Sequence, residues 1–308
     1  MEQQKDVKTK KIKKTWPENE CPKFRWVVAV ILGFIVANIV GAVVSGILDS
    51  YYADGFIRCS EGTFNFIKIC AVFASYFWFT LLFIKKIAKT RPMSFILGSS
   101  RKVNMKQVWI VALFTIGGII LGCIVDLPNI SLNKQIDINE LIFSVIFSAL
   151  FIWMQSGVEE IWFRGILGRM FFSDNLKQGI NVKSVIYVLI SVVLFSLAHG
   201  YNPEVTTSKG IEVLFAFMSY GVVGFVFCFV TLYYGSLLPA IVIHSVNNFL
   251  GSWLVGGEVS VLETPKILID KTESHAAFRS FLTVILTYAP LIIYLIIKRK
   301  KEKNESAV

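Results

Sequence analysis

The sequence predicts an all-α, polytopic transmembrane helix bundle with about eight spans, and its composition and its apolar runs are the reasons. The chain of 308 residues is 55% hydrophobic and includes 26 Phe, whereas charged residues make up only 17%. An ordinary soluble domain carries roughly 25% charged residues. The apolar residues are gathered in runs of about 20, the length that crosses a bilayer as a helix. Such runs must be helical, because a single segment in hydrocarbon can satisfy its backbone N–H and C=O groups only internally.

Eight apolar segments meet this description in order along the chain. The fourth is long and carries charges, and the fifth is short and contains Lys183. In the third, Gly118 and Gly122 have a small-residue spacing that suits close helix packing. The expected spans are residues 26–48, 64–84, 108–125, 141–172, 182–199, 213–234, 237–255 and 278–297. They form one transmembrane domain, residues 26–297, between basic segments at residues 1–25 and 298–308, with a motif-bearing core at residues 141–255.

Connections that are rich in lysine and arginine alternate with connections that are poor in them. Basic residues are dense before the first span, in the second connection, in and beside the fourth connection, and after the last span. They are sparse elsewhere. Cytoplasmic connections carry this excess, so the alternation predicts an even number of spans with both termini cytoplasmic. It also accounts for the net charge of +10. Because the lysines flank the spans, a role in topology and in contacts with lipid headgroups is favoured over nucleic-acid binding.

The fourth span contains the stretch SGVEEIWFRGIL, in which two carboxylates and an arginine interrupt an apolar run. Ionisable residues inside a span are costly and usually functional. Arg164 lies one helical turn after Glu160 and can pair with it. Glu159 is rotated by about 100° from Glu160, so it has no built-in counter-ion, as suits a general base. The alternative is a structural Glu160–Arg164 bridge with Glu159 at a helix crossing.

Two histidines lie in or at the end of other apolar runs. His199 follows Phe195 by four residues and closes the fifth span just before Gly200 and other helix breakers. His244 and Asn248 are four residues apart in the seventh span and so project from one face. The alternatives are a structural histidine at the membrane interface and a His/Asn pair that forms interhelical hydrogen bonds.

The three motifs together, E-E-x-x-x-R, F-x-x-x-H and H-x-x-x-N on separate apolar helices, resemble those of the CAAX protease and bacteriocin-processing family (CPBP, Abi-type) of intramembrane glutamate endopeptidases. The resemblance implies that Glu159 and His199 activate a water molecule. It further implies that His244 and Asn248 stabilise the oxyanion, which is usually a large catalytic contribution. The Glu160–Arg164 pair would then hold the helices in place. If the motifs form one site, we expect Glu159, His199, His244 and Asn248 to line a single cavity.

The resemblance also implies that no cofactor is needed, because the family is regarded as metal-independent. Two glutamates and two histidines could hold zinc, but the H-E-x-x-H signature is absent. Zinc therefore remains the alternative to an expected metal-free site.

The sequence is thus predicted to encode a membrane-embedded protease that hydrolyses a peptide bond of a hydrophobic peptide or lipidated protein. The substrate could be a prenylated CAAX segment, or a bacteriocin, pheromone or leader peptide. The richness in Lys, Ile and Phe favours a bacterial cell membrane. Two other classes stay open: a non-catalytic membrane immunity or partner protein, and a proton-coupled transporter, since buried carboxylates also carry protons.

Overall fold

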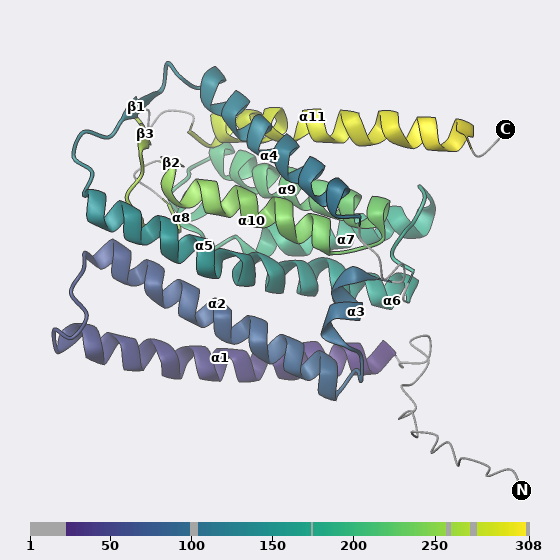
Figure 1. Ribbon diagram of the computed structural model, residues 1–308, viewed down its shortest axis with the longest axis horizontal. Helices are drawn as coiled ribbons and strands as arrows, with labels where there is room; N and C mark the ends of the chain where they lie inside the picture. Colours follow the sequence, from purple (N-terminus) through teal and green to yellow (C-terminus); the bar gives the residue numbers. More distant parts are fainter. Residues whose placement is uncertain (1–22, 99–103, 174, 257–259, 272–275, 306–308) are drawn as a thin grey trace, which may run out of the picture.

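The predicted all-α polytopic bundle is confirmed. The computed structural model describes residues 23–98, 104–173, 175–256, 260–271 and 276–305, so most of the predicted basic segment 1–25 lies outside the described residues. Long helices lie side by side and carry the chain back and forth between two ends of the bundle (Figure 1). Each expected span corresponds to one helical run: α1 Lys23–Ala53, α2 Glu61–Lys86, α4 Met105–Val125, the run from α5 Ile138–Glu160 to α6 Leu167–Phe172, α7 Val182–Ala198, α9 Ile211–Tyr234, α10 Leu238–Trp253 and α11 Ala276–Glu305.

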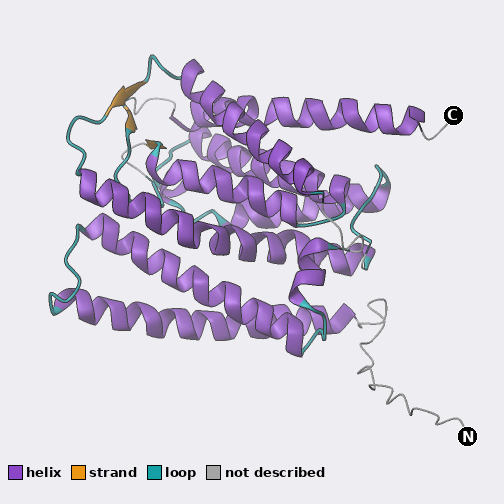
Figure 2. Cartoon of the chain, in the orientation of Figure 1, coloured by secondary structure: helices purple, strands orange, loops and turns teal. Residues whose placement is uncertain are grey.

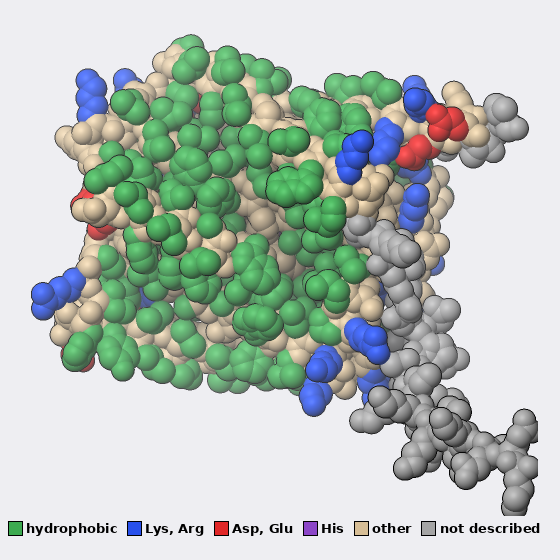
Figure 3. Space-filling model, viewed as in Figure 1, with side chains coloured by type: hydrophobic (Ala, Val, Ile, Leu, Met, Phe, Trp, Pro, Cys, Tyr) green, Lys and Arg blue, Asp and Glu red, His purple; other side chains and the backbone are tan. Residues whose placement is uncertain are grey.

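The described helices have the length and surface of a multi-pass integral membrane protein. Six of these helical runs are long and apolar enough to cross a membrane, and α7 is a shorter apolar helix. Helix α10 is 16 residues long. Hydrophobic side chains cover the middle of the visible face, and lysine and arginine lie towards its ends (Figure 3). An exposed apolar surface this continuous would be anomalous in water and is expected against lipid.

The two ends of the bundle differ in structure. Helix α1 begins and α11 finishes at one end, hereafter the termini end, where the short helix α3 Pro92–Leu97 also lies (Figure 1). At the opposite end, hereafter the sheet end, the connections form a small sheet that the sequence had not predicted (Figure 2). Its strand order is β1-β3-β2. The strands are β1 Ile130–Leu132, β2 Val255–Gly256 and β3 Leu268–Asp270, with β3 antiparallel to β1 and parallel to β2.

A buried lysine fastens the connection between β2 and β3. Burial lowers the pKa of Lys266 to about 8, so the side chain is still mostly protonated at neutral pH. Its ammonium group donates to the backbone oxygens of Ser252 and Leu262 at 2.9 and 2.8 Å and to Thr264 Oγ1 at 2.8 Å. The connection is thereby held against the C-terminal end of α10.

Glycine allows α4 and α11 to pack closely, as the sequence predicted for Gly118 and Gly122. A Cβ atom at Gly118 would collide with the backbone oxygen of Thr287 in α11. One at Gly122 would come within 2.8 Å of the Thr283 side chain. The small-residue spacing therefore marks a helix contact and not a site.

The helix boundaries refine the expected spans. Helix α7 ends at Ala198 with His199 as its C-cap, close to the predicted end. The seventh span is shorter than expected, because α10 ends at Trp253 and Val255 already belongs to β2. Helix α11 continues to Glu305, through most of the predicted basic tail at residues 298–308. The fourth run is not uniformly α-helical, because a π-helix, η2 Ile161–Ile166, joins α5 to α6.

Candidate active site

The two adjacent glutamates are the last residues of α5, directly before the π-helix. Glu160 is fully buried and Glu159 is 7% exposed. A π-helix widens the helical turn by one residue and occurs often at functional sites. Because it begins at Ile161, it sets where Arg164 lies relative to the glutamates. The two carboxylates face different partners, as the rotation between neighbouring positions predicts.

Glu160 joins three helices through two charged or ionisable partners. Arg164 Nη1 donates to Glu160 Oε1 at 3.1 Å, so the predicted pair is present. His244 Nδ1, from α10, lies 2.8 Å from the same oxygen. Arg164 also donates to the backbone oxygen of Gly224 in α9 at 3.3 Å. Its guanidinium lies 4.1 Å from the ring centroid of Phe195. The contact with His244 was not predicted, and it gives Glu160 a direct link to the third motif.

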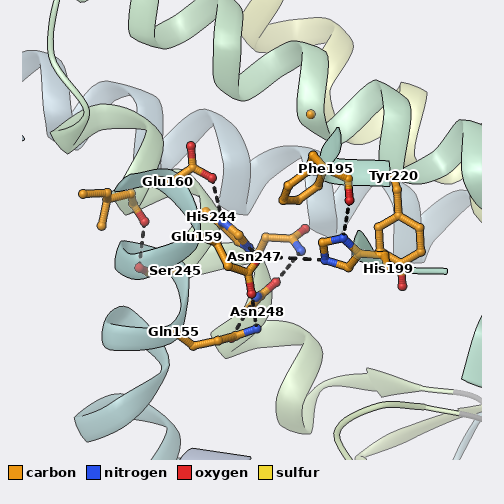
Figure 4. Close-up of polar contacts among 12 residues, drawn as sticks. Gln155, Glu159, Glu160, Phe195, His199, Tyr220, His244, Ser245, Asn247 and Asn248 are labelled. Atoms are coloured by element: carbon orange, nitrogen blue, oxygen red, sulfur yellow. Dashed lines mark hydrogen bonds and ion pairs between the residues drawn. The ribbon is translucent and has the colours of Figure 1, made fainter. Parts of the chain in front are cut away.

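Glu159 has a neutral partner that the sequence analysis had not assigned. Gln155 Nε2, one turn earlier on α5, donates to Glu159 Oε1 at 3.0 Å. The other carboxylate oxygen, Oε2, is buried without a hydrogen-bond partner in the described structure. His199 Nε2 lies 3.8 Å from this oxygen and His244 Nε2 lies 3.9 Å from it (Figure 4). The predicted convergence of Glu159 with the two histidines is therefore present, across three helical segments.

The partners of the two histidines define their tautomers. His199 Nδ1 lies 2.7 Å from the backbone oxygen of Phe195, which can only accept, so Nδ1 carries a proton. The His199 ring stacks on Tyr220 with centroids 4.3 Å apart, and this fixes its plane. His244 Nδ1 likewise donates to the Glu160 carboxylate. In the neutral form of either ring, Nε2 is then a hydrogen-bond acceptor directed towards Glu159.

A chain of amide hydrogen bonds links Glu159 to α10 and α11. Asn248 Nδ2 donates to Gln155 Oε1 at 3.1 Å. Asn247 Nδ2 donates to Asn248 Oδ1 at 3.1 Å, and the Tyr288 hydroxyl donates to Asn247 Oδ1 at 3.1 Å. Gln155 is thus a candidate site residue that the sequence analysis missed. The available signal was a lone amide one turn before Glu159 on an otherwise apolar helix.

An apolar cavity of about 620 Å³ adjoins the carboxylate. Glu159 and His199 line it, whereas its walls are mainly apolar side chains such as Phe34 of α1, Tyr76 of α2 and Trp162 of η2. His244 and Asn248 are not among its lining residues. The four motif side chains therefore meet at one place, but only two of them face the cavity.

The same side chains were tested as metal ligands. No group of three or more His, Cys, Asp and Glu side chains within the described ranges has the arrangement of a metal site. Two ligands of a tetrahedral zinc lie about 3.4 Å apart, given zinc–ligand bonds of about 2.1 Å. The distances of 3.8 and 3.9 Å from Glu159 Oε2 to the histidine nitrogens are longer.

Fold and site together define a polytopic membrane protein with a buried carboxylate–histidine–amide cluster beside an apolar cavity. Residues 140–250 match the model of the family described as "Type II CAAX prenyl endopeptidase Rce1-like". This segment is shorter than half of the chain, and it contains all three motifs. The resemblance to the CAAX protease family is confirmed, and the match supports membrane protease activity, and so a hydrolase, as the broad class of function.

A second comparison gives a more distant likeness over a longer stretch. The chain is 22% identical over 237 residues to "Uncharacterized protein YyaK" of Bacillus subtilis (strain 168), with 74% of each chain covered. No solved structure matches the chain.

Proposed function

We propose that this protein is an intramembrane endopeptidase in which Glu159 and His199 activate a water molecule for attack on a peptide bond. The observation that carries the proposal is the unpartnered Oε2 atom of Glu159 between two histidine Nε2 atoms. A buried carboxylate oxygen without a partner is costly unless water or substrate completes its hydrogen bonds. A water can lie about 2.8 Å from both Glu159 and His199, because the 3.8 Å gap is shorter than two such bonds.

The two residues then have distinct roles in the attack. His199 accepts one proton of the water in a hydrogen bond at Nε2 and orients it. Glu159 removes the other proton as the general base while the water oxygen bonds to the carbonyl carbon. The same proton passes from Glu159 to the leaving amine when the C–N bond breaks. One proton of the water thus passes through Glu159 to the amine, and the other stays on the new carboxyl group.

The third motif, His244 and Asn248, supplies the hydrogen-bond donors for the oxyanion. An amide NH₂ has two donors, and Asn248 uses one on Gln155, which leaves the second for the developing oxyanion. His244 can donate from Nε2 only when its ring carries a second proton, because Nδ1 already donates to Glu160. Donors directed at the oxyanion are worth on the order of 10² to 10³ in rate each.

The cavity favours a hydrophobic substrate. Its volume of about 620 Å³ lies within the usual range of about 300–1,000 Å³ for a ligand site, and its walls are apolar. A hydrophobic peptide or the lipid-modified end of a protein fits this chemistry, so CAAX-type, leader, pheromone and bacteriocin peptides all remain within the proposed class. Membrane lipids surround the bundle, and nucleic acid is not a proposed partner.

The test is cleavage of fluorogenic hydrophobic peptides by the purified protein in lipid vesicles. Glu159→Gln keeps the shape of the side chain and removes the base, so we expect normal thermal stability with hydrolysis reduced at least about 10²-fold. Glu61→Gln, at the exposed start of α2, is the matched control and should cleave as wild type does. Activity should persist with strong chelators.

Two outcomes would contradict the proposal. Equal cleavage by wild type and Glu159→Gln would show that Glu159 is not the base. Absence of any Glu159-dependent cleavage across the peptide set would favour a non-catalytic partner protein or a proton-coupled transporter.

A further inference from the structure

A second, smaller compartment adjoins the candidate active-site cavity on the side of the sheet end. Its volume is about 360 Å³, and Ile69, Phe73 and Val261 line both compartments. The first compartment has mainly apolar walls, whereas the second adds Ser45, Asn65, Lys68 and Glu263. The space open to a substrate therefore changes from apolar to polar along α2.

Two charged residues, Lys68 and Glu263, line the second compartment, and they differ in their partners. Lys68 Nζ forms an ion pair with Asp49 of α1 at 2.9 Å, so its charge is neutralised locally. Glu263 Oε2 accepts from the neutral amide of Asn65 at 3.0 Å. Within the described part of the chain, Glu263 makes no ion pair with a cation. With Asp49 counted beside its partner Lys68, the three charged groups at the compartment sum to −1, and Glu263 is the carboxylate without a cation among the described residues.

The fold holds Glu263 in a defined place. Its backbone packs on α2 so closely that a Cβ atom at Gly62 would collide with the Glu263 carbonyl oxygen. The neighbouring Leu262 accepts from the buried Lys266 ammonium at 2.8 Å, and Val261 N donates to Glu204 at 3.4 Å. The backbone of Glu263 is therefore held against α2, and its exposed carboxylate lies at the wall of the compartment.

The separation of the Glu159 and Glu263 carboxylates along the bundle follows from their neighbours on α2. Asn65 contacts Glu263, whereas a Cβ atom at Gly157 would lie 2.9 Å from Phe77, and Trp162 Nε1 donates to Thr80 at 3.0 Å. Glu159 therefore lies near the level of residues 77–80. At 1.5 Å per helical residue, the separation from Asn65 is about 18–22 Å. An extended peptide covers that length in about five or six residues, and fewer when a long basic side chain spans part of it.

We propose that Glu263 binds a positively charged group of the substrate, a lysine or arginine side chain or a free amino terminus, about four to six residues from the scissile bond. The inference rests on the proposed function. It deepens that function by naming the substrate class: a peptide whose apolar part occupies the first compartment and whose flank towards the sheet end carries a cation. The scissile bond then lies within the apolar part, about four to six residues from the cation.

The experiment is a positional scan with the purified protein in vesicles. The probes are hydrophobic peptides that contain one lysine at each position from two to eight residues on either side of the cleaved bond, and the same peptides with glutamate. We expect kcat/KM to rise about fivefold for lysine at four to six residues on one side, the size that an exposed ion pair gives. Glu263→Gln should remove this preference without changing cleavage of the uncharged parent, and Glu263→Lys should transfer it to glutamate.

The controls separate this inference from a failure of the enzyme. Glu61 lies one helical turn before Asn65 on α2 and outside both compartments, so Glu61→Lys should keep the lysine preference. Lys68→Gln should strengthen it, because Asp49 is then no longer neutralised. A flat scan, or a preference that survives in Glu263→Lys, overturns the inference while leaving the proposed function intact.

Binding supplies a readout that does not depend on turnover. The labelled lysine peptide should bind Glu159→Gln about fivefold more tightly than the glutamate peptide does, and Glu263→Lys added to that variant should reverse the order. Equal binding of both peptides would overturn the inference. If wild type cleaves none of the peptides, the proposed function fails separately.

Discussion

Within the described residues, Glu160 has hydrogen-bond contacts with two partners, Arg164 and His244, whereas Glu159, the proposed base, has one, Gln155. Glu160 binds both of its partners through one oxygen atom. A buried ion pair that loses one partner leaves an uncompensated charge, which typically costs about 3–5 kcal/mol. We therefore expect Glu160→Gln and Arg164→Ala to lower thermal stability and activity together, as measured by unfolding and peptide cleavage.

A double variant distinguishes the structural role of Glu160 from its effect on His244. Replacing a whole buried pair with apolar residues of similar volume is often neutral, so Glu160→Leu with Arg164→Met should regain most of the lost stability. It should not regain activity, because His244 Nδ1 then lacks its acceptor. Recovery of both would show that Glu160 acts only as a counter-ion.

Gln155 is the residue through which Asn248 and Glu159 are connected. Its amide donates to Glu159 and accepts from Asn248. We expect Gln155→Ala and Asn248→Ala each to reduce kcat on the order of 10²-fold, the cost of one oxyanion donor. Because both belong to one hydrogen-bonded chain, the double variant should lose less than the product of the two. Gln107→Ala, at the start of α4, is the control, and fully multiplicative losses would contradict the connection.

At the scale of helices, α4 and α11 provide a test with a matched pair of neighbouring glycines. A methyl group at Gly118 meets the Thr287 backbone, whereas one at Gly117 meets nothing within 4 Å. We expect Gly118→Ala to destabilise the protein by about 1–3 kcal/mol through overpacking. Gly117→Ala should be neutral or stabilising by up to about 1 kcal/mol, from helix propensity. Thermal unfolding in the same detergent measures both, and equal effects would contradict the packing.

The long helices could be predicted because an apolar segment in a membrane must be helical. Structure that depends on contacts between distant parts of the chain could not. The apolar runs predicted every long helix, and Gly200 with Pro203 predicted the end of α7 near His199. The π-helix was not predictable, because its sequence does not differ from an ordinary helical segment. The small sheet also depends on contacts between strands far apart in the chain, such as Ile130 with Asp270.

The site shows the same division. Spacing by four residues predicted the Glu160–Arg164 pair, since helical geometry alone brings these residues together. The contacts of His244 with Glu160 and of Asn248 with Gln155 join residues 84 and 93 positions apart, and no local pattern indicates them. For the same reason, the expectation that all four motif residues line one cavity is wrong for His244 and Asn248, which lie outside the cavity lining.

For the whole molecule, the remaining prediction is its orientation in the membrane. Basic residues gather at the termini end, and cytoplasmic connections carry such an excess. We therefore expect α3 at the cytoplasmic face and the α1–α2 connection, with the sheet and the Glu263 compartment, at the outer face. Single cysteines at Asp54 and at Met93, each exposed, report the two ends after the five native cysteines are replaced. In intact cells an impermeant maleimide should label Asp54→Cys at once and Met93→Cys only after permeabilisation. The reverse pattern would place the polar compartment in the cytoplasm, so that the basic flank of a substrate would have to approach the cavity from that side.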